Sequence, residues 1–265
     1  MDFQQVQYPI DVIVQRIRTG RLALPDFQRD FVWNPNQVVE LLDSVARQWP
    51  IGSLLLLSGP QPFAFRPVAA APIIDDGTLD LYILDGQQRV TALFHAIADV
   101  SQFCYYVDFQ DLLEGGDSPF RWERRVRFEK DYPTLQARAT ARIALITDIY
   151  DAERFYEWLG LQDAAHDRAK FLSLREKRLT GLHAKVYKVM AIVLDQTIEL
   201  EALARIFETL NRTGVALNAF DLMVAALYPS GFNLREQWES VKDAHPVIRY
   251  FDPSELEIIK LIALL

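Results

Sequence analysis

The sequence predicts an α/β fold of the mixed (α+β) kind, because short apolar runs alternate with segments of helical periodicity. The runs at 51–57, 79–84 and 103–109 have the length and composition of buried strands. The segments at 34–49 and 87–98 place apolar residues at helical spacing. Such alternation is typical of an α/β core. We expect this core over residues 1–135 and a mainly helical extension over 136–265, with one returning strand near 185–194.

The composition is that of an ordinary globular protein. The chain has 265 residues, of which 50% are hydrophobic and 24% charged. A net charge of −8 argues against a protein that coats nucleic acid along its whole surface, although a local basic groove is compatible with it. The single Cys104 allows no internal disulfide and no cysteine metal cluster, which fits a reducing cytosol. Without a signal-peptide pattern at the start or an apolar run long enough to cross a bilayer, we expect a cytoplasmic protein with no membrane partner.

The first two elements are a short helix and an aromatic segment. Apolar residues at helical spacing predict a helix over 8–17, ended by Gly20. Segment 24–33 then mixes Pro with large aromatics around two polar residues, Gln28 and Arg29. One interpretation is a loop pinned to the core, and the other is a binding segment that holds these polar heads in place. The expected aromatic anchors are Phe27, Phe31 and Trp33.

A helix start follows at Asn34-Pro35, where Asn is a good cap and Pro suits the first helical position. Trp49-Pro50 ends this helix. The run 51–57 predicts a strand buried on both faces, and residues 60–77, rich in Pro and Ala, predict a surface connection.

The central stretch of the chain is residues 81–93, which predict a strand, a tight turn and a helix in direct succession. The strand over 79–84 breaks at Asp85-Gly86, and the helix over 87–98 follows at once. The amino end of a helix offers unpaired N–H groups and partial positive charge, so it attracts anions such as phosphate. Arg89 adds a fixed cation, and Asp85 offers a metal ligand or proton acceptor. The alternative is an ordinary turn with a helix cap.

The next stretch contains a strand over 103–109, a polar turn over 111–118 and a strand over 120–128. The last strand places Trp122, Val126 and Phe128 on one face and carries four arginines. These arginines could face phosphate groups, or they could protect an edge strand by charge.

Helices are predicted over 147–159 and 163–182, and a buried strand over 185–194. A helix over 199–210 ends at the polar stretch 211–214, which is either a second wall of the site or simple capping chemistry. Further helices are expected around 218–228, 234–241 and 253–265. Because the last helix ends on apolar residues without a cap, we expect this chain to be the front part of a longer protein.

The sequence lacks the motifs of several common kinds of active site. It contains no Walker-type loop, no dinucleotide fingerprint and no Gly-x-Ser-x-Gly elbow. The four histidines show no paired ligand spacing for zinc, and His95 is read as a packed or surface residue rather than a base. The candidate site is therefore the junction from Asp85 to Arg89.

Three sequence motifs, taken in their order along the chain, resemble those of a known family. They are Leu-Pro-Asp-Phe-Gln-Arg-Asp-Phe-Val-Trp at 24–33, Asp-Gly-Gln-Gln-Arg at 85–89 and Phe-Glu-Thr-Leu-Asn-Arg-Thr-Gly at 207–214. Together they resemble the N-terminal domain of GmrSD-type modification-dependent restriction proteins, over about residues 5 to 228. The resemblance implies a ParB- and sulfiredoxin-like fold that binds and hydrolyses nucleoside triphosphates, with relatives in phage-defence systems that sense modified or phosphorothioated DNA.

The resemblance also implies site residues, matched motif by motif. The catalytic set implied is Asp85, Gln88 and Arg89, with Asp85 as a ligand of Mg²⁺. The nucleotide-binding set implied is Gly86, Gln87, Gln28, Arg29, Asn211, Arg212 and Gly214.

Family members usually carry their nuclease in a separate C-terminal domain with an HNH-like His motif, which this chain lacks. The first hypothesis is therefore an NTP-hydrolysing regulatory domain coupled to a nuclease domain or subunit and to modified DNA, with a homodimer as a further expected assembly. The second is a non-enzymatic DNA-binding or nucleotide-sensing module. The third and weakest is a nuclease in its own right.

Overall fold

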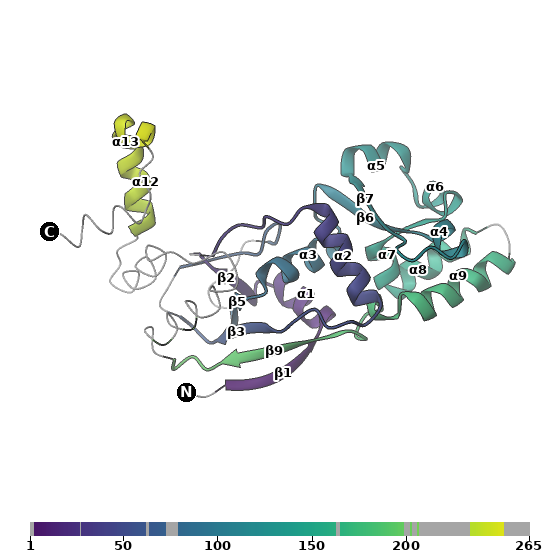
Figure 1. Cartoon of the computed structure of the whole chain (residues 1–265), viewed down its shortest axis with the longest axis horizontal. Coiled ribbons are helices and arrows are strands. Elements are labelled where there is room, and N and C mark those ends of the chain that lie inside the picture. Colours follow the sequence, from purple (N-terminus) through teal and green to yellow (C-terminus); the bar gives the residue numbers. More distant parts are fainter. Residues whose placement is uncertain are drawn as a thin grey trace.

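Two β-sheets organise the chain in the computed structural model, which describes residues 3–26, 28–61, 64–72, 79–162, 165–198 and 234–251 and the single positions 202 and 206. The larger sheet is mixed and has the order β1-β9-β3-β5-β2-β4, and the smaller has the order β7-β6-β8 (Figure 1). This arrangement confirms the predicted α/β class. The strands are β1 (Phe3–Pro9), β2 (Leu22–Pro25), β3 (Leu54–Ser58), β4 (Phe65–Arg66), β5 (Leu81–Asp85), β6 (Phe103–Asp108), β7 (Phe120–Arg124), β8 (Ile143–Leu145) and β9 (Lys188–Leu194).

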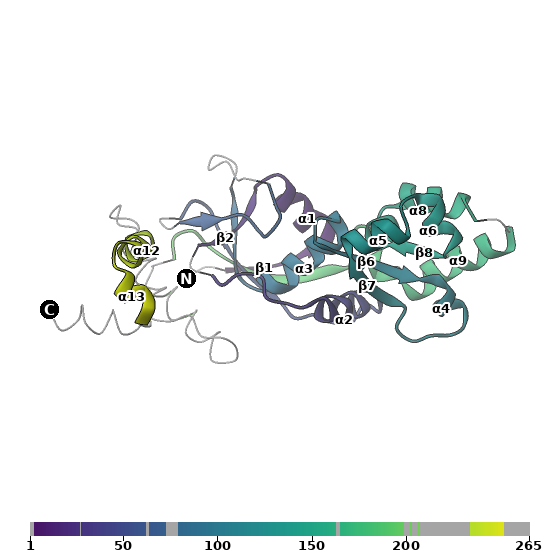
Figure 2. The same cartoon turned by 90° about the horizontal axis from the view of Figure 1, so that it is seen from above.

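Helices connect and cover these strands. The first three helices pack against the larger sheet, and helices α4 to α9 lie around the smaller sheet (Figures 1 and 2). The helices are α1 (Ile10–Arg18), α2 (Pro35–Ala46), α3 (Gln87–Ala98), α4 (Phe109–Leu113), α5 (Arg125–Asp131), α6 (Leu135–Thr140), α7 (Ile146–Tyr150), α8 (Ala152–Gly160), α9 (Ala165–Arg178), the 3₁₀ turn η2 (Thr180–Leu182), α12 (Leu234–Ala244) and α13 (Pro246–Phe251).

Strand β9 enters the larger sheet between two strands from the start of the chain. It pairs antiparallel with β1 over its whole length and parallel with β3 from the pair Leu54–Ala191 onward. Strand β3 in turn pairs antiparallel with β5, with Leu55 opposite Asp85. The carboxyl end of β5 therefore lies beside the amino end of β3, and the strand expected near 185–194 is present over 188–194.

Alternate residues of the larger sheet face two apolar clusters, as the two-residue period of a strand requires. Leu54, Leu56 and Ile83 join the cluster that contains α1, α2 and α3. Leu55 and Leu57 join the cluster on the other face. Residues 54–57 are therefore buried on both faces, as predicted, but the strand expected over 51–57 begins only at Leu54, where its pairing with β9 begins.

The start of α2 confirms the predicted cap. The Asn34 side-chain oxygen accepts hydrogen bonds from the N–H groups of Asn36 at 3.0 Å and Gln37 at 3.1 Å, while the Gln37 side chain accepts one from Asn34 N–H at 2.9 Å. This reciprocal capping box satisfies donors that a helix start otherwise leaves unpaired.

The beginning of the chain corrects one prediction. Residues 3–9 form β1, so the helix expected over 8–17 begins only at Ile10. Strand β1 is mostly exposed and polar, and therefore lacks the apolar alternation that marks a strand in a sequence. Its existence depends on pairing with β9, which is distant in the chain.

The strand expected over 120–128 is also corrected. Strand β7 ends at Arg124, which lies opposite Phe103, the first residue of its partner β6. With no partner strand beyond this point, the chain turns into α5, which starts at Arg125. Val126 is consequently 85% exposed while Phe128 is buried, so they do not share a face.

Three smaller differences fall in the region between 109 and 160. The polar turn expected over 111–118 overlaps α4, which Asp108 caps through the N–H groups of Gln110 and Asp111. Strand β8 was not predicted, because three residues are too few to show a period. The helix expected over 147–159 is divided at Asp151, whose side chain caps α8.

Three of the four arginines around β7 are engaged within the protein. Arg121 pairs with Asp111 at 3.2 Å, Arg125 with Asp99 at 2.7 Å, and Arg127 lies near two acidic side chains. Strand β7 is also at the edge of its sheet. The structure therefore favours the edge-strand interpretation over a phosphate-facing strip.

Some predictions fall outside the described residues. These are the aromatic anchor Phe27, most of the helix expected over 199–210, the polar stretch 211–214, and the helices around 218–228 and over 253–265. The division of the chain at 135 likewise stays a prediction. In the part of the chain that the structure describes, no helix has the length and apolar character needed to cross a membrane.

Candidate functional site

The predicted strand-turn-helix is present at the carboxyl end of β5. Gly86 is buried and has φ 90° and ψ 10°, a left-handed conformation that favours glycine. It precedes the first residue of α3, and no side chain caps this helix start. The first N–H groups of α3 are thus donors without a capping side chain, at the positive end of the helix dipole.

Arg89 is held in a fixed position beside this turn. Its Nη1 donates to the carbonyl oxygen of Ile51 at 2.7 Å, and its Nη2 lies 3.1 Å from the Asp85 carboxylate. The guanidinium is 19% exposed, whereas the Asp85 side chain is 50% exposed. The cation therefore lies in a partly buried niche that opens toward a solvated carboxylate.

Two glycines shape this niche. A Cβ on Gly52, which has φ 85°, would lie 2.5 Å from Arg89 Nη1, and a Cβ on Gly86 would lie 3.1 Å from Arg89 Nη2. The Gly86 Cβ would also lie 2.4 Å from a methyl of Leu54. Only residues without a side chain allow the guanidinium to approach both backbones this closely.

The segment 28–33 is attached to the start of α3 by both glutamines of the motif. Gln88 Nε2 donates to the Asp30 carbonyl at 2.9 Å, and Gln88 Oε1 accepts from Val32 N–H at 3.0 Å. Gln87 Nε2 donates to the Arg29 carbonyl. Gln87 and Gln88 are 6% and 7% exposed, so these hydrogen bonds are shielded from water. Gln87 Oε1 is buried and has no hydrogen-bond partner among the residues that the structure describes.

Two further side chains complete this attachment. Gln28 Nε2 donates to the carbonyls of Ile83 at 2.7 Å and Leu84 at 2.8 Å, at the end of β5. Arg66 of β4 donates to the carbonyls of Gln28 and Arg29, and its guanidinium lies 3.1 Å from the Asp30 carboxylate. The predicted residue Gln28 thus joins the first motif to the second through the backbone.

Arg29 differs from the other motif residues because its side chain is exposed. Its backbone is fixed by Gln87 and Arg66, yet its guanidinium has no ion pair with any residue that the structure describes. The expectation of a buried polar head is wrong for Arg29, whereas a solvent-facing cation close to the motif is present.

His95 lies on α3, two turns after the motif, and is a packed residue as predicted. It is 8% exposed, its Nε2 is 2.9 Å from the Ala69 carbonyl, and its ring packs edge-on against Phe31 with centroids 5.0 Å apart. Burial lowers the pKa of His95, and the bond to Ala69 opposes this only in part. The ring lines a cavity of about 240 Å³ together with Phe31, Trp33 and Phe103.

The structure brings the first two motifs together, and the third lies outside the described residues, so the positions of Asn211, Arg212 and Gly214 stay untested. Sequence reasoning missed Ile51, Gly52 and Arg66. A glycine just before an apolar run was the only signal for Gly52. No sequence signal pointed to the backbone carbonyl of Ile51 or to the distant Arg66, because their roles depend on tertiary contacts.

The junction presents uncapped backbone N–H groups and the guanidinium of Arg89, a combination whose charge suits an anion. The described residues hold no cluster of three or more His, Cys, Asp or Glu side chains suited to a metal. One carboxylate is nevertheless compatible with Mg²⁺, which is commonly held by one or two carboxylates and the substrate's phosphates. Asp85 fits that role, since one of its oxygens pairs with Arg89 and its side chain is half exposed.

Comparisons with known proteins agree with the three motifs. The family model described as "GmrSD restriction endonuclease, N-terminal domain" matches residues 10–228. The uncharacterized protein MJ0686 of Methanocaldococcus jannaschii is 27% identical over 266 residues, which cover 90% of this chain and 44% of that protein. The chain thus spans less than half the length of this relative.

Proposed function

The chain belongs to the family of GmrSD restriction endonuclease N-terminal domains, and from this premise we propose that it binds and hydrolyses nucleoside triphosphates. In this proposal, hydrolysis regulates a nuclease that acts on modified DNA. The nuclease is a separate domain or subunit.

One observation carries the proposal, the arrangement of charge around the start of α3. Uncapped helix N–H groups, the partly buried guanidinium of Arg89 and the exposed guanidinium of Arg29 all belong to segments joined by Gln28, Gln87 and Gln88. Phosphate groups are stabilised by such donors and cations. The orphaned Oε1 of Gln87, buried beside them, is an acceptor available to a bound hydroxyl or N–H group.

Each residue has a distinct role in the proposed reaction. The N–H groups at 86–88 bind phosphate oxygens, and Arg89 exchanges its pairing with Asp85 for the charge that develops on the transferred phosphoryl group. Asp85, released from Arg89, holds Mg²⁺ or orients the attacking water. When bound, the metal supplies charge neutralisation between the phosphates.

Binding without hydrolysis is the second candidate, and Gln88 favours it. Both amide atoms of Gln88 are used by the backbone of Asp30 and Val32, so in this arrangement the side chain is not free to place a water. Its predicted catalytic role requires the 28–33 segment to detach. A module that senses nucleotide or binds DNA without turnover requires no such change.

Phosphate release from ATP, GTP, CTP and UTP with Mg²⁺ tests hydrolysis directly. Asp85→Ala is expected to abolish turnover, because Asp85 is the carboxylate that would bind the metal or orient water in the proposed reaction. Glu157→Ala, at an exposed position of α8, is the control and should leave the rate unchanged. Phosphate release by Asp85→Ala at the rate of the unsubstituted chain would refute the assignment.

The DNA-related parts of the proposal need separate measurements. Modified DNA is expected to change the rate of phosphate release, and unmodified DNA of the same sequence is the comparison. Cleavage of a modified plasmid by this chain alone would support the weaker hypothesis of an intrinsic nuclease. Sedimentation with and without nucleotide tests the expected homodimer.

A further inference from the structure

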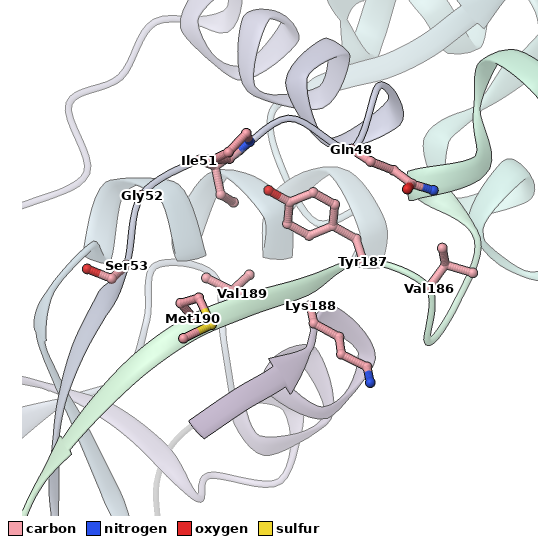
Figure 3. A pocket seen from close by; sticks show the side chains of 10 residues that line it. Gln48, Ile51, Gly52, Ser53, Val186, Tyr187, Lys188, Val189 and Met190 are labelled. Carbon is pink, nitrogen blue, oxygen red and sulfur yellow. The ribbon is translucent and has the colours of Figure 1, made fainter. Parts of the chain in front are cut away.

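The parallel strands β3 and β9 separate at their amino ends and form a fork. Their pairing begins at Leu54–Ala191, whereas β9 continues back to Lys188 and, among the strands that the structure describes, pairs there with β1 alone. The chain before β3 instead turns away through Gly52 toward α2. A cavity of about 450 Å³ lies between the two prongs of the fork, residues 48–53 and 186–190 (Figure 3).

The interior of the fork cavity is largely apolar. Figure 3 shows the ring of Tyr187, the residue just before β9, extending toward Ile51 on the opposite prong, with Val189 beside it. The Tyr187 hydroxyl donates to the Trp49 carbonyl, which fixes the ring. Ser53 and Met190 lie at the exposed rim, and Met190 is 42% exposed. Gln48 and Lys188 also line the cavity, and Figure 3 shows the Lys188 side chain extending away from the ring of Tyr187. The side chains between the two prongs therefore suit a flat and uncharged group rather than an ion.

The fork cavity shares its wall with the Arg89 niche. The carbonyl of Ile51 accepts the hydrogen bond from Arg89, while the side chain of Ile51 faces Tyr187. Gly52 lines the cavity and also contacts the guanidinium. A single dipeptide therefore separates the cation of the proposed phosphate site from the apolar space.

We propose that the fork cavity binds the nucleobase of the nucleoside triphosphate whose phosphates lie at residues 85–89. The inference rests on the proposed function and adds to it the place where the base is recognised. The β3-facing edge of β9 before Ala191 is outside the ladder, so its backbone groups can pair with the polar edge of a base. The cavity beside His95 is a poorer candidate, because its 240 Å³ is below the range of about 300–1,000 Å³ usual for ligand pockets.

Titration calorimetry on the unsubstituted chain gives the first test. ATP, GTP, CTP and UTP are compared with inorganic tripolyphosphate, which carries a similar phosphate chain but no base. At least one nucleotide is expected to bind about tenfold more tightly than tripolyphosphate, a difference of about 1.4 kcal/mol. Equal affinities for all five would overturn the base site while leaving the phosphate site in place.

Two variants that block the fork from opposite prongs give the second test. Met190→Trp and Ser53→Trp are each expected to weaken binding of the preferred nucleotide about tenfold and to leave tripolyphosphate binding unchanged. Val126→Trp, at an exposed position of α5, is the matched control. Far-UV circular dichroism and thermal unfolding show that each variant is folded.

The outcomes separate the two proposals. If a folded Met190→Trp or Ser53→Trp chain kept its nucleotide affinity, the fork cavity would not be the base site. The proposed function would be unaffected by that result. Absence of any nucleotide and tripolyphosphate binding by the unsubstituted chain would overturn the proposed function, and the base site with it.

Discussion

At the residue scale, the position of Arg89 depends on two neighbouring glycines, Gly52 and Gly86, which have no side chain. Gly52 and Gly86 both adopt positive φ. A Cβ on Gly52 would clash with Arg89, and a Cβ on Gly86 would clash with Leu54 and lie only 3.1 Å from Arg89. The guanidinium consequently reaches the Ile51 carbonyl and the Asp85 carboxylate at the same time. Since the ion pair with Asp85 is half exposed, it contributes at most about 1 kcal/mol, and a bound phosphate can replace it.

Gly52→Ala tests this positioning. The added methyl meets Arg89 at 2.5 Å and also strains the left-handed backbone at φ 85°. We expect the free energy of unfolding, measured by urea titration, to fall by about 1–3 kcal/mol, and nucleotide affinity to fall as well.

Gly115→Ala is the control that isolates backbone strain. Gly115 has a similar φ of 87°, but nothing lies within 4 Å of an added Cβ. We expect its nucleotide affinity to stay that of the unsubstituted chain. Equal effects of the two substitutions on affinity would show that contact with Arg89 is unimportant.

At the element scale, the 28–33 segment is the least regular part of the site and yet is firmly attached. It has no helix or strand of its own. Gln87, Gln88, Gln28 and Arg66 instead provide its hydrogen bonds, and Phe31 packs on His95. The segment is therefore a loop pinned to the core, as the first sequence interpretation had it, and the second interpretation, a binding segment, stays a prediction.

Gln88→Leu tests the attachment. Leucine keeps the volume but leaves the Val32 N–H and the Asp30 carbonyl without partners, which costs about 1–3 kcal/mol per buried group. We expect lower stability and faster hydrogen exchange at the Val32 amide. Gln136→Leu, at an exposed position of α6, is the control and should change neither. Unaltered exchange at Val32 would show that other contacts hold the segment.

At the scale of the whole molecule, one apolar core connects the two sheets. A single cluster contains Leu54 and Ile83 of the larger sheet, Val107 of the smaller sheet, and Trp158 and Phe171 of the later helices. Strand β9 also returns from beyond residue 180 to separate β1 from β3. The predicted boundary at 135 is therefore crossed by both the core and the sheet.

A fragment of residues 1–135 tests whether that boundary is a folding boundary. Without β9, strand β1 loses its partner, and the core loses Trp158 and Phe171. We expect this fragment to show no cooperative thermal unfolding, whereas a fragment of residues 1–198, which includes β9, should unfold cooperatively. A cooperative transition of the shorter fragment would establish 1–135 as an independent domain.

The sequence predicted the elements whose signals are local. The Asn34 cap, the strand before Asp85 and the helix from Gln87 are all present at the expected places. It could not predict β1, which is polar and exists through its distant partner β9, or the end of β7, which is set by the length of β6. The match to residues 10–228 confirms the resemblance that the three motifs indicated.

By itself, the sequence determined the fold class and the strand, turn and helix around Asp85 to Arg89, because turn chemistry and helical periodicity are properties of neighbouring residues. It also indicated the family, through the resemblance of its three motifs. Only the tertiary structure decided how this junction is built. It joined Gln28 to the end of β5, assigned Gln88 to the backbone of another segment, and placed Gly52 against Arg89. It also opened the fork beside them, since the separation of two strands depends on where each one's partner ends. Such contacts join residues far apart in the chain, and no local pattern encodes them.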